Sequence, residues 1–204
     1  DEFTVTLTGY GGHAARPHMT VDPVVVGAQI VAGLQSVVAR NVDPVESAVV
    51  TVTKFHAGDA FNVIPQVAHL GGTARTLSPG VRDLVERRMA EVVELTARAH
   101  GASAEFHYRR DYPVLINHEG RTGFAAEVAE GVAGEGRVER EAPPIMGGED
   151  FSFMLNERPG AFIFVGNGDS APVHHPDYDF NDEAIPAGCS YWARLAEAAM
   201  PLRG

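Results

Sequence analysis

The sequence has 204 residues, 45% of them hydrophobic and 21% charged, which suffices for one large or two small soluble domains with a buried core. Its formal net charge of -11 excludes a general affinity for nucleic acid, because phosphates would be repelled and both adjacent arginine pairs lie beside acids. The single cysteine, Cys189, excludes an intrachain disulfide and a cysteine-based zinc ribbon; we assign it to helix packing, and one thiol fits a reducing cytoplasm.

We expect neither a membrane partner nor a signal peptide. No apolar run approaches the roughly 18 residues that a membrane span requires. The chain opens at Asp1 in strand-like sequence without an initiator methionine, and we interpret it as an excised piece of a longer protein.

The first half of the chain predicts a four-stranded antiparallel sheet with two helices on one face. Period-two alternation and β-branched runs predict the strands, while apolar residues at helical spacing predict the helices. The elements follow as a strand at 3–8, a helix at 22–41, strands at 49–55 and 67–76, a helix at 78–101 and a strand at 104–109. The order β-α-β-β-α-β is typical of the ferredoxin-like plan, so we expect an α+β fold.

Tyr112-Pro113 marks the expected domain boundary, which gives domains at 1–113 and 114–204. Beyond it the pattern predicts helices at 119–133, 149–155 and 185–200, with an apolar strand at 161–165. So few strands make a thin domain, and we expect this part to be half of a larger α/β domain.

The chemistry-bearing residues are densest in segment 174–182, HHPDYDFND. Neutral imidazole and carboxylate are ligands that zinc, manganese and cobalt accept. A catalytic metal site needs about three protein ligands and an open position, which this segment alone does not supply.

Four further motifs each allow a functional and an ordinary interpretation. The glycine-rich turn GYGGHAARPH could cradle a ligand or simply carry surface histidines, and Asn62 in FNVIP could be an ordinary turn residue. Arg75 in GTART could clamp a carboxylate or pair with a surface acid. Glu149 in GGEDF could lie near a metal or cap a helix.

In this order the motifs resemble the M20 family of metal-dependent peptidases and amidohydrolases, in particular its aminoacylase- and hippurate-hydrolase-like branch. The resemblance runs over essentially the whole chain. It implies that 1–113 is a ferredoxin-like lid and dimerisation domain and that 114–204 is the C-terminal part of an α/β zinc-peptidase-like catalytic domain. The family's earlier segment, which carries most metal ligands and the general base, matches nothing here.

The resemblance also implies roles for individual residues. His174 falls on the last metal ligand, while His175 and Glu149 are either structural residues or neighbours that contact the ligands of the metal. His13 matches the histidine that reaches across a homodimer to polarise the scissile carbonyl. Asn62 and Arg75 match contacts to the substrate carboxylate and the oxyanion, and we expect both to face one cleft.

From these roles we expect a homodimer that cleaves the amide bond of N-acyl amino acids or related small amides. The implied cofactor is a divalent metal (zinc, manganese, cobalt or nickel), two per complete subunit. The chain by itself should be inactive. The alternatives are a non-catalytic dimerisation or binding module, or another activity of the family: carbamoyl-amino-acid hydrolysis, dipeptide cleavage or succinyl-diaminopimelate desuccinylation.

Overall fold

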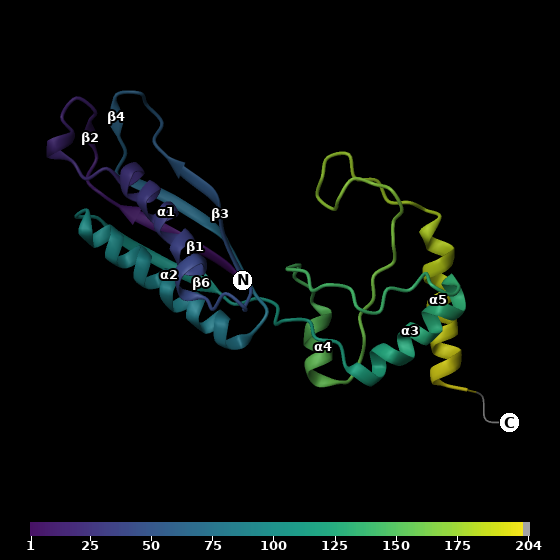
Figure 1. Cartoon of the computed structure of the whole chain (residues 1–204). Helices are drawn as coiled ribbons and strands as arrows, with labels where there is room; N and C mark the ends of the chain where they lie inside the picture. The colour runs from purple at the N-terminus through teal and green to yellow at the C-terminus, as the bar shows by residue number, and fades with distance from the viewer. Residues whose placement is uncertain (202–204) are drawn as a thin grey trace. The chain divides into compact units, whose positions relative to one another are not determined.

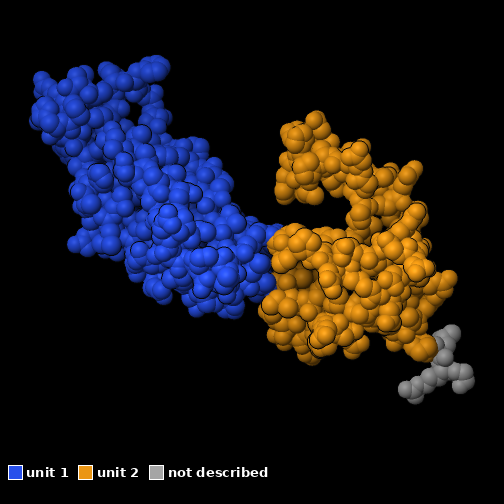
Figure 2. All heavy atoms as spheres, viewed as in Figure 1, with its two compact units in different colours: residues 1–114, 146–148 blue, residues 115–145, 149–204 orange. Residues whose placement is uncertain are grey.

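The computed structural model describes residues 1–201, which divide into two compact units (Figure 2). The first unit comprises Asp1–Val114 and Met146–Gly148, and the second comprises Leu115–Ile145 and the chain from Glu149 onward. The first stretch of this unit ends one residue beyond the boundary that the sequence indicates, and Met146–Gly148 join it from the range expected in the second domain. The assignment of the units to a lid and to part of a catalytic domain stays a prediction.

The first unit contains the predicted four-stranded antiparallel sheet. Its strands are β1 (Glu2–Thr8), β3 (Ala48–Ala57), β5 (Val67–Thr76) and β6 (Ser103–Arg109), in the spatial order β3-β5-β1-β6. Every neighbouring pair is antiparallel. The helices α1 (Pro23–Asn41) and α2 (Pro79–Ala99) pack against each other and share one buried core with the sheet (Figure 1). This arrangement is the one that the split-βαβ order predicts.

Both helices begin as their sequences indicate, with a capping side chain followed by proline at the first helical position. The carboxylate of Asp22 accepts a hydrogen bond from the Val24 N–H at 2.8 Å, and the Ser78 hydroxyl accepts one from the Val81 N–H at 3.3 Å. Alternate β1 residues point into the core, and the remaining ones line a second sheet face that no helix covers. We call this second face the open face.

Helix α1 corrects one expectation, because it is long and apolar enough to cross a membrane by length and composition. The statement that no apolar run approaches that length was wrong. Val26, Ile30, Leu34 and Val37 of this helix lie in the core against the sheet. Each such burial stabilises the fold by about 1.5–3 kcal/mol, so the core accounts for the apolar face of α1.

At one end of the sheet the structure adds a feature that the sequence did not predict. Strand β2 (Gly12–His13) pairs with β4 (Val63–Ile64), and a short 3-10 helix, η1 (Pro17–Met19), follows β2 (Figure 1). We call residues 9–21 and 58–66 together the arm.

The second unit contains three helices, α3 (Glu119–Ala133), α4 (Phe151–Glu157) and α5 (Ala184–Ala199), close to their predicted ranges. Within its described residues there is no strand, so the strand expected at 161–165 was wrong. A strand needs a neighbour for its backbone groups. Here the Asn117 side chain takes that place, since its amide donates to the Phe162 carbonyl at 2.9 Å and its oxygen accepts from the Phe162 N–H at 2.8 Å.

Candidate functional site

The arm brings two of the predicted site residues together. His13 on β2 stands opposite Val63 on β4, and Asn62 immediately precedes β4. The Ala14 N–H donates to the Asn62 carbonyl at 3.0 Å, which ties the two segments together beside His13. The side chains of His13 and Asn62 are both exposed. The arm therefore holds the backbone segments of His13 and Asn62 together by hydrogen bonds and leaves both side chains exposed.

Gln66 anchors this arm to the sheet, a role that the sequence analysis did not identify. Its side chain accepts from the Gly11 N–H at 2.9 Å and donates to the Gly9 carbonyl at 2.6 Å. A side chain on Gly9 would place its Cβ 2.1 Å from the Val21 carbonyl oxygen, so glycine is required there. A lone glutamine after a proline carries no periodic signal, and only the folded arm shows what it does.

The His13 ring is held in one tautomer. Its Nδ1 accepts a hydrogen bond from the Ala15 N–H at 3.1 Å. A neutral imidazole that accepts at one nitrogen carries its proton on the other. The exposed Nε2–H of His13 is therefore a hydrogen-bond donor, which is the form that can stabilise a developing oxyanion.

Arg75 lies far from this pair within the same chain. It stands near the C-terminal end of the ten-residue strand β5, whereas Asn62 precedes that strand. Val67 and Arg75 are eight residue steps apart, which is roughly 26 Å at about 3.3 Å per residue. The expectation that Asn62 and Arg75 of one chain face one cleft was therefore wrong. The half-buried Arg75 guanidinium donates to the carbonyls of Asp1 and Ala74, both at 3.3 Å.

A buried carboxylate organises the end of the sheet near Arg75. The carboxylate of Asp1 accepts hydrogen bonds from the Arg82 guanidinium, from the Tyr108 hydroxyl at 2.8 Å and from the Asp111 N–H at 3.0 Å. Burial raises the pKa of Tyr108 to about 12, and the nearby Glu86 carboxylate adds to this. Asp1 thus links the first strand, the second helix and the segment that leaves the last strand.

His174 and His175 lie in an exposed turn of the second unit. His174 has a φ of 73°, and it is the one non-glycine residue with positive φ among residues 1–201. Such a backbone costs free energy and is often found where a side chain must be aimed at a ligand. The Nδ1 of His175 accepts from the Asp177 N–H at 3.1 Å, so the local backbone fixes its ring as well.

Glu149 has a local structural role in the second unit. Its carboxylate accepts from the Phe151 N–H at 3.1 Å, and its carbonyl accepts from the hydroxyl of the buried Ser152 at 2.6 Å. These contacts stabilise the turn that leads into α4, whose N-cap residue is Asp150 without a side-chain capping bond. The role of Glu149 near a metal stays a prediction.

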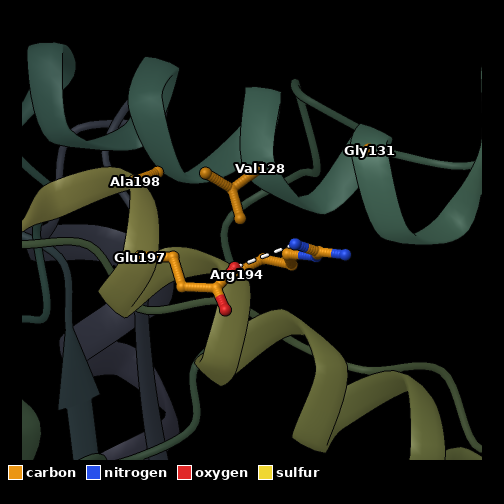
Figure 3. A pocket seen from close by; sticks show the side chains of 5 residues that line it. All are labelled: Val128, Gly131, Arg194, Glu197 and Ala198. Atoms are coloured by element: carbon orange, nitrogen blue, oxygen red, sulfur yellow. Dashed lines mark hydrogen bonds and ion pairs between the residues drawn. The ribbon is translucent and has the colours of Figure 1, made fainter. Parts of the chain in front are cut away.

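Among residues 1–201 no group of three or more histidine, cysteine or acidic side chains is placed to hold a metal ion. The described surface of the second unit has a shallow depression of about 540 Å³ between α3 and α5, which contains the ion pair of Arg194 with Glu197 at 2.9 Å (Figure 3). None of the predicted site residues lines this depression. Its lining residues are Val128, Gly131, Arg194, Glu197 and Ala198.

Comparison with known proteins places the motifs in their context. A sequence profile of peptidase family M20/M25/M40 matches residues 6–198. The chain belongs to this family. It is 37% identical over 198 residues to N-acetylcysteine deacetylase of Bacillus subtilis and 34% identical over 196 residues to hippurate hydrolase of Campylobacter jejuni, with 96% of this chain covered in both comparisons.

A solved structure supports the same relationship. A dinuclear metal-binding peptidase of the M20 family from Bacillus subtilis matches with a TM-score of 0.71 and 31% identity, over 97% of this chain and 49% of that one. The chain spans about half the length of the curated relatives it matches, 51% of both the deacetylase and the hippurate hydrolase.

Proposed function

We propose that this chain is the lid and the C-terminal catalytic portion of a metal-dependent amidohydrolase that cleaves N-acyl amino acids. The observation that carries the proposal is the arm, in which the backbone beside His13 is hydrogen-bonded to Asn62 and the His13 Nε2–H is available as a donor. The relatives named for deacetylation of N-acetylcysteine and for hippurate hydrolysis support this substrate class, because both reactions break an amide next to an amino-acid carboxylate.

The donor set of the chain fits part of a metal site. His174 supplies an imidazole from a strained turn, and no trio of ligands accompanies it among the described residues. A divalent ion bound there would polarise the amide carbonyl and lower the pKa of a bound water. We assign His174 as one ligand, and we expect the chain to bind and turn over substrate only when the remaining ligands are present.

The residues of this chain would act on the two charged ends of the substrate. His13 would donate through Nε2–H to the oxygen that becomes negative as the tetrahedral intermediate forms, and the Asn62 carboxamide would donate beside it. Arg75 has a planar guanidinium suited to two parallel hydrogen bonds with the amino-acid carboxylate. Its bonds to two carbonyls at 3.3 Å are long, so a carboxylate could compete for its N–H groups.

We infer that the two ends of one lid serve different active sites. Because roughly 26 Å of strand β5 lies between the arm and Arg75, one chain cannot present both to a small substrate. A homodimer resolves this, with His13 and Asn62 from one subunit and Arg75 from the other. Strand β3 is an edge strand with exposed Val49 and Phe55, and such an edge can pair with a second copy.

The second unit supports the proposal that it is part of a larger domain. Large apolar side chains on its surface are exposed by half or more, which is more than a finished domain usually shows. They include Ile116, Ile145, Phe153, Met154, Phe164, Val173, Phe180 and Trp192.

The test is to join the chain to the preceding half of the Campylobacter jejuni hippurate hydrolase and to assay hippurate and N-acetyl amino acids with Zn²⁺ or Mn²⁺. We expect turnover by the joined protein and none by the chain alone. His13→Ala should lower kcat by about a hundredfold or more, as removal of an oxyanion donor does, while His18→Ala on the same arm should not. Activity that survives His13→Ala would contradict the assignment.

A non-catalytic dimerisation module remains the second candidate, since the first unit has a core of its own. Light scattering on the joined protein and on the chain alone separates the cases. If both the joined protein and the chain alone are dimers without turnover, the dimerisation module is favoured. If both are strict monomers, it is excluded.

A further inference from the structure

Two exposed histidines face each other on the open face of the sheet, away from the residues considered so far. His56 on β3 and His69 on β5 are direct partners in the antiparallel register. The neighbouring pair, Phe55 and Leu70, points the other way, since Leu70 is buried in the core and the Phe55 ring lies against Gly27 of α1. His56 and His69 therefore project together from the open face. Directly opposite residues on one face have Cβ atoms about 4.5–5.5 Å apart.

A third residue orients one of these rings. Thr6 on β1 is the next partner of His69 across the sheet, and its Oγ1 lies 3.4 Å from the His69 Nδ1. Metal-binding histidines usually bond through their second ring nitrogen to an acceptor, which fixes the ring. The contact to Thr6 leaves the His69 Nε2 as the free nitrogen. The His56 side chain makes no hydrogen bond or ion pair with any residue that the structure describes.

The two histidines also lie on either side of the base of the arm. His56 is the penultimate residue of β3, and His69 is the third residue of β5. Between them runs the segment 58–66, which carries Asn62 and β4 and forms one side of the arm. A link between the two histidines would close this segment at its base.

We propose that His56 and His69 form a bidentate site for a divalent transition metal, Cu²⁺, Ni²⁺ or Zn²⁺, which clips the base of the arm. Two neutral imidazoles supply nitrogen ligands that these ions prefer, at metal–nitrogen distances of about 2.0–2.1 Å for zinc, and solvent fills the other positions. Among the cations on this face, Lys54 belongs to the next pair of the β3–β5 ladder that points this way, but its stem extends over Gly71 in the neighbouring row. The site is independent of the proposed hydrolase activity.

The test is calorimetric titration of the whole chain with CuCl₂, NiCl₂, ZnCl₂ or MnCl₂. His174→Ala and His175→Ala are present in every sample, so that the exposed turn does not contribute. We expect one site with affinity in the order copper, nickel, zinc, manganese. Because the ligands act as a chelate, His56→Ala, His69→Ala and the double variant should lose the site to the same extent. Thr6→Val should weaken it about tenfold, as loss of an orienting partner does.

The matched control is His107→Ala, which removes an exposed imidazole from the same face whose cross-strand partner is Thr4. This variant should titrate like the parent, and thermal unfolding without metal should be unchanged in all of them. The chelate would be overturned if the losses of metal affinity in the two single variants simply add in the double variant. It would also be overturned if either single variant still binds the metal like the parent. Hydrogen exchange over 58–66 should slow with NiCl₂ only when both histidines are present. Binding without such slowing would overturn the clip.

Discussion

The two units of this chain contain similar helices but differ in what those helices cover. In the first unit, α1 and α2 close one face of a sheet, and residues from all of these elements join a single core. In the second unit, the buried residues among those described are Ala125, Ala126, Ser152 and Tyr191. Amphipathic helices therefore form in both, yet only the unit that completes a sheet buries its apolar side chains.

A segment can have the apolar composition of a buried element without being buried or forming that element. Segment 161–165 has the apolar composition of a buried strand, but its Phe164 and Val165 are exposed and its backbone bonds to a side chain. In the first unit, the seven-residue strand β1 has a neighbour on each side. A strand pattern becomes a strand only where another strand supplies the partner groups.

The largest expected effect is on the core of the first unit. Leu34→Ala removes a fully buried side chain and should lower the free energy of unfolding by about 2–5 kcal/mol. Leu95→Ala on the exposed face of α2 is the control and should change it by less than about 0.5 kcal/mol. Urea unfolding measures the free energy of unfolding of both variants, and hydrogen exchange then shows which elements lose protection. If α3 loses protection together with β1 in Leu34→Ala, the two units unfold as one and the contrast between them fails.

Sequence reasoning succeeded where local signals and global packing agree. The caps at Asp22 and Ser78 and the alternation in β1 predict the elements of the first unit within a few residues, because each signal is physical and local. The arm escaped prediction, since β2 and β4 have two residues each and depend on a side-chain anchor from Gln66. Likewise, Asn62 and Arg75 are thirteen residues apart in the sequence. This spacing does not show that an extended strand separates them in space.

Gly9→Ala tests whether the arm can be loosened without the core. Its Cβ would lie 2.1 Å from the Val21 carbonyl oxygen, and the clash should cost about 1–3 kcal/mol in local stability. Exchange of the amides in 10–21 should speed up while those of β1 and β5 stay protected. Gly80→Ala, where a Cβ meets nothing within 4 Å, should have little effect. A global loss of stability in Gly9→Ala would show that the arm and the core are one cooperative unit.

Tyr108→Phe addresses the cluster around Asp1. It removes the hydroxyl that donates to the Asp1 carboxylate at 2.8 Å and should cost about 1 kcal/mol at neutral pH. Because burial raises the pKa of Tyr108 to about 12 from about 10 when unfolded, its neutral form adds stability that is complete below pH 10. That stability is lost as the pH rises toward 12. The difference between the parent and Tyr108→Phe in the free energy of unfolding should therefore shrink over this window.

The smallest effect should come from the second unit. Asn117→Ala removes both hydrogen bonds to the Phe162 backbone, but each is worth about 1 kcal/mol at most where the surroundings are partly wet. We expect faster exchange in 161–165 and no change in the unfolding of the first unit. Arg194→Ala, which breaks an exposed ion pair, should be silent in both readouts. If the amides of 161–165 exchange just as slowly without Asn117, its side chain does not take the place of a neighbouring strand. Other contacts within the second unit then order the segment.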